Sequence, residues 1–258
     1  MSIFYKSAKD IEAMRKSAEI LSKAHGEVAK HVRSGVKTKY LDKIAQEYIK
    51  DSKGTPSFLN YNGFPASLCI SVNDQVVHGF PSDYELRSGD VISIDCGVYF
   101  EGFHADCAYT YPIGEVSKEV LKLLKSTKES LYVGIESMKV GSRVGDIGYA
   151  IQQYVEKNGY SIIRELTGHG VGRNLHEKPE VPNFGQRGKG PLIRNGLVIA
   201  VEPMVNMGRR DIVQLQDGWT IRTKDRKPSA HYEHTVAFID NKVEILTSFK
   251  YIEEVFNF

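Results

Sequence analysis

Four acidic residues lie inside or directly beside strongly apolar segments of this chain, where carboxylates are uncommon. Asp95 ends the segment VISID and Glu202 ends LVIAVE, while Asp106 lies in FHADCAYTY and Glu233 in HYEHTVAFI. A buried lone carboxylate is so unfavourable that it must be paired, protonated or bound to a cation. Because few basic residues accompany these acids, we expect two divalent cations to balance the four charges, with bridging carboxylates holding both ions.

A glycine-rich segment supplies a nitrogen ligand for such a site. Residues 167–172 read TGHGVG, with His169 between two glycines, and His176 follows shortly after. The glycines let the backbone pass close to an ion or a substrate. Mostly oxygen ligands with one imidazole favour a site for Mn, Fe, Co or Zn over a thiolate zinc site.

Each of these residues also has an ordinary structural explanation. An acid at a strand end is usually a turn or cap residue, and a lone histidine on an apolar strand is usually a packed core residue. The metal interpretation gains because Asp95 and Glu202 occupy corresponding places in a repeat, and because each acid lies beside another polar residue. Spacing alone favours the metal site only slightly.

The repeat relates two halves of the chain. LRSGDVISID at 86–95 recurs as IRNGLVIAVE at 193–202, and residues 35–50 match 141–156 at nearly the same offset. Two separate matches indicate an ancient duplication rather than chance. We therefore expect a single domain, residues 1–258, whose halves cover about 1–114 and 115–258 and meet at a pseudo-twofold.

Helical spacing of apolar residues predicts a helix pair in each half, beside strands that form a curved sheet. The apolar stripes cover 11–32, 41–49, 120–135 and 147–155. Ser7 is the expected N-cap of the first helix. The second helix should end near Gly54, and the fourth at Asn158-Gly159. The strand-like runs are 67–72, 91–100, 105–111, 198–206 and 232–239.

Composition and charge bound the class of protein. The 258 residues carry 34 basic and 32 acidic side chains, a net charge of +2, which gives no electrostatic footprint for a DNA partner. The cysteines Cys69, Cys96 and Cys107 form no CxxC motif, so neither a disulfide framework nor a thiolate zinc site is indicated. The chain opens without an apolar signal core, and its apolar runs are too short to span a bilayer. We expect a cytoplasmic protein with no membrane partner.

The segments around the candidate ligands resemble the methionine aminopeptidases, in particular the short bacterial type (type I). The resemblance covers nearly the whole chain and is carried by residues 61–81, 89–111, 167–185, 196–206 and 217–236. It implies the pita-bread fold, an α+β arrangement of pseudo-symmetric halves with helix pairs outside a curved antiparallel sheet. It also implies a dinuclear metallo-exopeptidase, which removes the N-terminal initiator methionine from nascent proteins and peptides when a metal-bridging hydroxide attacks the first peptide bond.

The resemblance assigns the metal ligands. Asp106 and Glu233 would bridge two divalent ions, Co, Mn, Fe or Zn, whose identity the sequence leaves open. Asp95 would bind one ion, and His169 and Glu202 would complete the other. By the same resemblance, Asn73 and Ser229 match positions that help to hold a monovalent cation.

The resemblance also assigns catalytic and substrate-binding residues. Glu202 would shuttle the proton, His176 would stabilise the oxyanion, and His78 would contact the scissile amide nitrogen. The substrate pocket would be formed by Tyr61, Phe64, Cys69, His78, His176 and Trp219. An alternative for the aromatic residues is ordinary packing in the core or in a loop. Phe58, Phe64 and Leu175 differ from many bacterial members, which leaves fine substrate and inhibitor preference open.

The resemblance further implies the partners. These are N-termini of nascent chains in which a small residue follows methionine. The family's work on nascent chains also suggests transient ribosome contact through the mostly basic stretch 222–227. For that stretch an ordinary solvated loop is the favoured explanation. We expect a monomer. One alternative is a proline-specific peptidase or creatine-type hydrolase, which normally carries a further N-terminal domain. Another is an inactive binding protein of this fold, which would normally lack some of the ligands.

Overall fold

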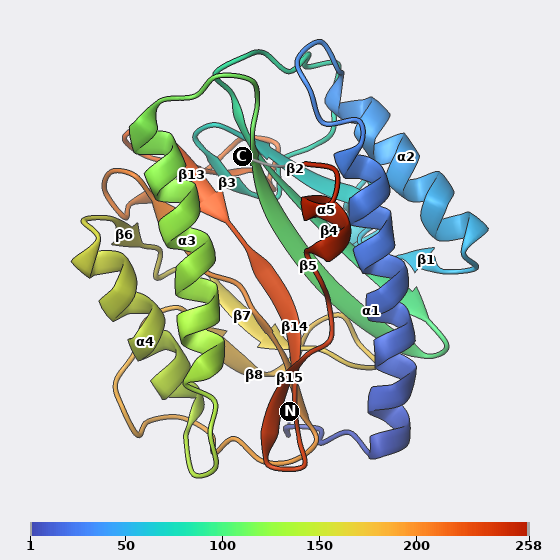
Figure 1. Ribbon diagram of the computed structural model, residues 1–258, viewed down its shortest axis with the longest axis vertical. Coiled ribbons are helices and arrows are strands. Elements are labelled where there is room, and N and C mark those ends of the chain that lie inside the picture. The colour runs from blue at the N-terminus through green and yellow to red at the C-terminus, as the bar shows by residue number, and fades with distance from the viewer. Residues whose placement is uncertain (1, 257–258) are drawn as a thin grey trace.

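The computed structural model describes residues 2–256, and its helices gather on one side of a large β-sheet (Figure 1). They are α1 (Ala8–Ala29), α2 (Thr38–Asp51), α3 (Lys118–Glu136), α4 (Val144–Lys157) and the short α5 (Lys250–Glu253). The first four confirm the predicted stripes, while α5 lies outside them. Ser7 caps α1 as predicted, because its hydroxyl accepts a hydrogen bond from the Asp10 amide at 3.2 Å. Gly159, at a φ of 83°, follows the C-cap of α4.

The large sheet joins the two halves of the chain through antiparallel pairs. Within the described residues it has nine strands in the order β1-β4-β5-β14-β9-β7-β8, with β2 on β4 and β15 on β14. Its strands are β1 (Thr55–Pro56), β2 (Leu68–Val72), β4 (Val91–Phe100), β5 (Phe103–Pro112), β7 (Thr167–Gly170), β8 (Glu177–Pro182), β9 (Leu197–Val201), β14 (Glu233–Ile239) and β15 (Lys242–Ile245). The halves meet where Ala108 of β5 lies opposite Glu233 of β14.

Two small sheets lie beside the large one. In the described chain each has three strands, in the orders β13-β10-β6 and β11-β12-β3. Their strands are β3 (Gln75–Val77), β6 (Ser161–Ile162), β10 (Met204–Asn206), β11 (Ile212–Gln214), β12 (Ile221–Thr223) and β13 (Ser229–His231). Val77 of β3 pairs with Ile221 of β12. This pairing brings His78, which follows β3, close to Trp219 in the loop before β12, with ring centroids 6.3 Å apart.

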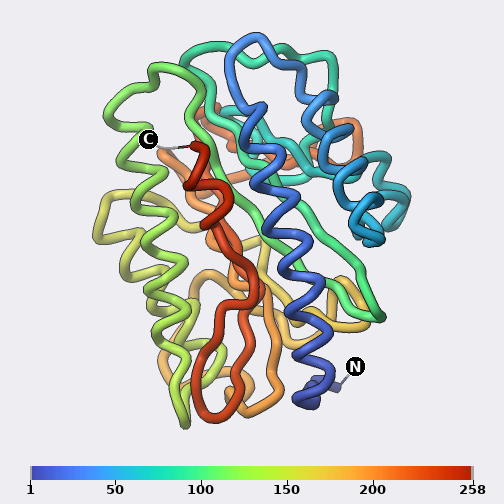
Figure 2. The backbone as a smooth tube through the Cα atoms, turned by 45° about the vertical axis from the view of Figure 1, so that its right-hand side comes forward, coloured from blue at the N-terminus to red at the C-terminus, as the bar shows by residue number. Residues whose placement is uncertain are grey.

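The helices cover the sheet in two groups. Figure 2 shows α1 and α3 side by side, with the C-terminal segment running between them. The buried stripe of α1, which includes Met14, Ala18 and Leu21, has no solvent exposure. Burial of a Leu or Met side chain contributes roughly 1.5–3 kcal/mol. No helix within residues 2–256 is long and apolar enough to cross a membrane.

Strand alternation decides which side chains face the helices and which face away. Ile94 and Cys96 of β4 belong to the main core, so Asp95 between them points to the opposite face of the sheet. On β5, Cys107 belongs to the same core, and Asp106 points away from it. Both cysteines are buried and free of disulfides, so their side chains pack in the core.

Two strand predictions need correction. The run 198–206 is not one strand, because β9 ends before Glu202 and β10 begins after Pro203. Pro203 lacks an N–H and cannot continue a central ladder, so the chain leaves the large sheet here and enters a small one. Asp95 does not end its strand but lies in the middle of β4. Of these two acids, only Glu202 lies at the end of a strand.

Candidate metal centre and active site

A cavity of about 430 Å³ lies on the sheet face turned away from the helices, a size suited to a small ligand. Every predicted metal ligand lines it, together with both predicted active-site histidines and all the predicted pocket residues. These residues are Tyr61, Phe64, Cys69, His78, Asp95, Asp106, His169, His176, Glu202, Trp219 and Glu233. The structure thus brings side chains from both halves of the chain to one place.

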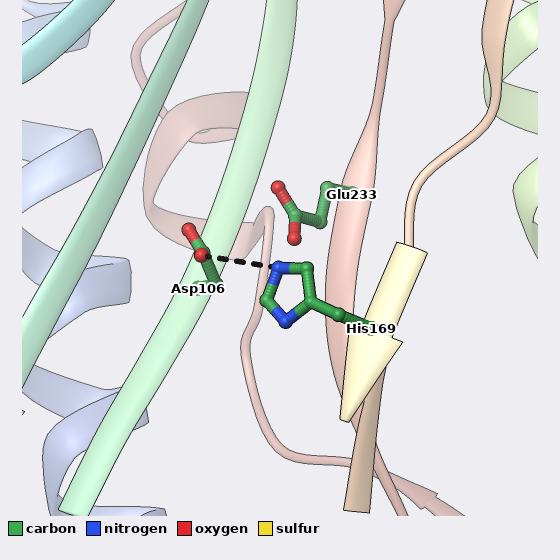
Figure 3. Close-up of side chains that lie close together, drawn as sticks. All are labelled: Asp106, His169 and Glu233. Carbon is green, nitrogen blue, oxygen red and sulfur yellow. Dashed lines mark ion pairs between the residues drawn. The ribbon is translucent and has the colours of Figure 1, made fainter. Parts of the chain in front are cut away.

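Asp106, His169 and Glu233 point toward one another from β5, β7 and β14 (Figure 3). One ligand atom from each lies within 4.8 Å of the others. The Nε2 atom of His169 lies 3.8 Å from Asp106 Oδ2 and 3.6 Å from Glu202 Oε1. These separations are too long for hydrogen bonds. They suit atoms that surround a common cation rather than atoms that bind each other.

Unpartnered polar atoms show that the cluster fits divalent ions. The Oδ1 atom of Asp95 and the Oε1 atom of Glu233 are buried, and neither has a hydrogen-bond partner in the described chain. Among the described residues that line the cavity there is no lysine or arginine to pair with the acids. Four carboxylates and one imidazole are a ligand set for Mn, Fe, Co or Zn. The residues present therefore fit the metal ions that the sequence predicts.

Burial and mutual repulsion raise the pKa values of all the clustered acids. Burial raises the pKa of Asp95 to about 7. Burial, with a further contribution from the charges of Glu233 and Asp95, raises the pKa of Asp106 well above its usual value. Glu202 and Glu233 also have strongly raised pKa values, caused first by burial and then by neighbouring carboxylates. Without a cation the cluster keeps protons near neutral pH, and a cation must displace them to bind.

This proton binding predicts how pH affects the metal-free protein between about pH 6.5 and 8.5. Burial raises the pKa of Asp95 to about 7, and the pKa values of Asp106, Glu202 and Glu233 are also raised well above their ordinary values. A group with a raised pKa contributes stability that is fully present below its unfolded pKa and is lost as pH rises through its folded pKa. Buried histidines with lowered pKa values act in the opposite direction, because unfolded histidine, with a pKa of about 6.5, loses its proton over the same range. These histidines are present in metal-free and metal-loaded protein alike, so the melting temperature of chelator-treated protein should fall relative to that of metal-loaded protein across this window.

Metal-loaded protein is the control for this experiment. Its ligands are deprotonated throughout the window, so it lacks the loss of stability that the acids cause, and the gap in melting temperature between the two forms should widen with pH. A gap that stays constant or narrows from about pH 6.5 to 8.5 would contradict the raised pKa values.

His169 is held as a neutral ligand. Its Nδ1–H donates to the carbonyl of Gly170 at 2.9 Å, which leaves the Nε2 lone pair directed at the acids. Burial, assisted by nearby His176, lowers the pKa of His169 to about 3. A neutral imidazole with a fixed tautomer is the form that binds a metal ion.

His176 lies at the cavity wall against His169, with ring centroids 4.1 Å apart. Its Nδ1 atom is 2.8 Å from the Tyr61 hydroxyl. When that hydroxyl donates to Nδ1, the ring proton is on Nε2 and is available to a substrate oxygen. Desolvation, assisted by His78, lowers the pKa of His176 to about 4, so the ring is neutral at physiological pH.

His78 has a strained backbone. Its φ is 59°, a left-handed conformation that is uncommon for residues other than glycine. The carbonyl of His78 accepts a hydrogen bond from the Thr220 hydroxyl at 3.4 Å, which links it to the start of β12. Strain held by surrounding structure is typical of functional positions. Burial lowers the pKa of His78 as well.

The aromatic pocket residues pack together on one side of the cavity. The Phe64 ring meets Trp219 edge to face, with centroids 5.2 Å apart. Phe58 and Leu175 are buried in the same cluster with Cys69. Burial raises the pKa of the Cys69 thiol well above its ordinary value, so this residue stays protonated and is an apolar wall rather than a nucleophile.

His231 is a cavity residue that the sequence interpretation missed. It is almost fully buried, and its Nε2 atom lies 3.7 Å from Glu202 Oε2 and 4.0 Å from Glu233 Oε2. The signal was present in the sequence, because residues two apart on an extended chain share a face, and His231 precedes Glu233 by two. Asn183 was missed too; its side-chain amide donates to the Glu202 carbonyl at 3.0 Å.

Asn73 and Ser229 lie beside each other, outside the lining of this cavity. The Ser229 amide donates to the Asn73 carbonyl at 3.0 Å. The side chain of Asn73 donates to Asp90, and the Ser229 hydroxyl donates to Asn206, each at 2.9 Å. The two residues are therefore adjacent, as a common cation site would require. The monovalent cation itself stays a prediction.

The sequence of this chain is similar to those of known proteins. The pattern of the family described as metallopeptidase family M24 matches residues 12–239. The chain is 52% identical to the methionine aminopeptidase of Clostridium perfringens over 248 residues, which cover 96% of this chain and 100% of that protein. It is 46% identical to methionine aminopeptidase 1 of Bacillus subtilis over 245 residues, or 95% of this chain and 99% of that protein.

Solved structures confirm the predicted pita-bread fold. The crystal structure of methionine aminopeptidase from Rickettsia prowazekii has a TM-score of 0.94 at 38% identity, covering 96% of this chain and 100% of that chain. The prolidase from Pyrococcus furiosus has a TM-score of 0.75 at 20% identity, covering 95% of this chain and 65% of that one. The second likeness concerns the fold alone.

Proposed function

The chain belongs to metallopeptidase family M24, and we propose that it is a methionine aminopeptidase that removes the initiator methionine from the amino termini of nascent proteins. The observation that carries this proposal is the convergence of four carboxylates and His169 on one cavity whose other wall is aromatic. The near full-length identity to named methionine aminopeptidases supports it.

The cluster supports the ligand assignment that the resemblance implies. Asp106 and Glu233, whose carboxylates lie within 4.8 Å of each other and of His169, would be shared by two divalent ions. Asp95 would help to hold one ion, and His169 with Glu202 would help to hold the other. When bound, two divalent ions would lower the pKa of a water toward neutrality and so supply a nucleophile for peptide hydrolysis.

The protein's own side chains manage the proton and the developing charge. Glu202 has one oxygen toward His169 and the other toward His231, so its carboxylate is held at the centre of the cavity. From this place it would take a proton from the attacking water and return one to the leaving amine. His176 donates a hydrogen bond to the oxyanion of the tetrahedral intermediate. His78 contacts the scissile amide nitrogen.

The pocket favours an unbranched thioether side chain. Phe64, Trp219 and Tyr61 give it aromatic walls, and contacts between a thioether sulfur and aromatic rings contribute about 0.3–1.5 kcal/mol. The preference for a small second residue rests on the resemblance to the methionine aminopeptidases.

The remaining assignments concern the setting of the enzyme. We assign a cytoplasmic location, a monomeric state and nascent polypeptides as substrates, with transient contact to the ribosome. A monovalent cation near Asn73 and Ser229 would steady β13, whose third residue is His231. The division of the single domain into halves of about 1–114 and 115–258 follows the repeat.

A peptide assay tests the proposed activity. Protein loaded with Mn, Co or Fe should release methionine from a Met-Ala peptide and spare both a Met-Lys peptide and one with a blocked amino terminus. Free methionine is measured by chromatography, with chelator-treated protein as the control. Cleavage of X-Pro dipeptides in preference to Met-Ala peptides would instead indicate a prolidase, and the absence of cleavage with every metal would contradict both activities.

A further inference from the structure

The segment before α1 reaches the loop that carries His176. The amide of Lys6 donates to the carbonyl of Gly196 at 2.7 Å, which fixes this segment beside the start of β9. From there the Lys6 side chain extends to Glu177, the first residue of β8, and its Nζ atom lies 2.6 Å from Glu177 Oε2. A segment at the start of the chain is thereby joined to the residue that directly follows His176.

This ion pair is unlike the others of the described chain that involve lysine. The side chains of Lys6 and Glu177 are only 5% and 4% exposed, whereas Lys16 and Glu101, paired at 2.8 Å, are 52% and 48% exposed. A buried pair is costly to break, because the remaining charge is left without a partner in a poorly solvated place. Exposed pairs contribute little. The Lys6 contact therefore imposes a fixed geometry that a surface pair does not.

The pair also fixes the loop of residues 172–176. Glu177 Oε1 accepts a hydrogen bond from the Asn174 amide at 3.1 Å, so the same carboxylate that binds Lys6 closes the loop. Lys6 packs so closely that a Cβ added to Gly172 would come within 2.5 Å of its Cε atom. One lysine side chain therefore contacts the loop at both ends, at Gly172 and at Glu177.

These contacts restrain the position of His176. It lies between Asn174 and Glu177, at a centroid separation of 4.1 Å from the His169 ring. We propose that Lys6 is a positioning residue of the active site, whose buried ion pair with Glu177 holds the His176 ring in register with the metal ligands. This role rests on the proposed aminopeptidase function. The segment before α1 is then part of the catalytic apparatus and not a mere extension of the helix.

Lys6→Met tests the role, because methionine has a similar length and no charge. Released from Lys6, the loop lets His176 drift, and a misplacement of about 1 Å can cost about a hundredfold in rate. We expect kcat on a Met-Ala peptide to fall about 10- to 100-fold with little change in KM. Lys16→Met is the matched control, since it breaks an exposed pair on α1, and it should retain wild-type kcat.

A double-mutant cycle separates positioning from general damage. If Lys6 acts through His176, Lys6→Met should reduce kcat much less in a His176→Ala background than in the wild type. Equal reductions in both backgrounds would overturn the proposal. Failure of wild-type protein to cleave any Met-Ala peptide would instead overturn the proposed function, so the two failures are distinguishable.

Two further measurements cover the outcome in which Lys6→Met folds poorly. Lys6→Met with Glu177→Gln removes both charges and keeps an acceptor for the Asn174 amide, so it should fold while still showing the loss in kcat. Hydrogen exchange of the metal-free protein should be faster in residues 172–177 of this double variant than in Lys16→Met. Wild-type kcat together with unchanged exchange in the folded double variant would overturn the proposal.

Discussion

His176→Ala is expected to keep both metal ions and to lose about 10²- to 10³-fold in kcat. The His176 ring lies beside His169, but His176 is not one of the five residues assigned as metal ligands. The interaction it supplies forms with the oxyanion, and removing one such donor typically costs about 10²–10³ in rate. Metal content by elemental analysis and steady-state kinetics on a Met-Ala peptide measure the two quantities separately.

Tyr61→Phe is the matched control for this variant. It deletes only the hydroxyl that lies 2.8 Å from His176 Nδ1 and leaves the ring that packs in the pocket. The loss in kcat should be smaller than for His176→Ala, because the Nε2 donor remains and only its tautomer and orientation are less fixed. Loss of metal from His176→Ala would contradict the assignment of this residue to the substrate rather than to the ions.

Local pattern accounts for the parts of the fold that the sequence predicts well. Apolar stripes of period 3.6 identify the four long helices, and the cap at Ser7 follows from the preference of hydroxyl side chains for that position. Period-two alternation places Asp95 and Asp106 on the face away from the helices. These features depend on neighbours within a few residues, so a single sequence suffices to predict them.

Contacts between distant residues are what local pattern does not predict. Lys6 and Glu177 are 171 residues apart in the sequence, and no pattern of residues near either one predicts that they form an ion pair. The run 198–206 divides at Pro203 because β9 pairs within the large sheet and β10 pairs within a small one, and the partners of both strands lie elsewhere in the sequence. The spacing of His231 from Glu233 places both on one face of an extended chain, but a histidine beside an apolar strand also has an ordinary packing role. Its closeness to Glu202, which lies in another part of the chain, depends on the tertiary fold.

The pairing of strands from the two halves of the chain explains why the acids converge. Two hairpin-like arrangements, β4 with β5 and β9 with β14, are placed side by side by the pairing of β5 with β14. Each contributes two acids on the same sheet face, so four carboxylates surround one point. Burial in the cavity raises their pKa values, and a pair of bound cations would offset this cost.

Glu233→Gln is expected to abolish turnover while making the metal-free protein more stable at pH 8. The neutral amide removes a buried charge whose repulsion raises the pKa of Asp106, so the cluster relaxes and the melting temperature of chelator-treated protein rises above that of the wild type. The same change removes a bridging carboxylate. Metal affinity should fall more than about 100-fold, beyond the effect of substituting an outer-shell partner.

Turnover should fall at least about 10³-fold, because metal ions supply several kcal/mol of catalysis and each ~1.4 kcal/mol is tenfold in rate. Glu180→Gln is the matched control, since Glu180 is an exposed carboxylate on β8, 64% accessible and paired with Lys178 at the surface. It should leave metal binding, turnover and the metal-free melting temperature unchanged. Opposite movements of stability and activity in Glu233→Gln distinguish a functional charge cluster from a structural one, in which both would fall together. Wild-type metal content in Glu233→Gln would remove the basis for a bridging role.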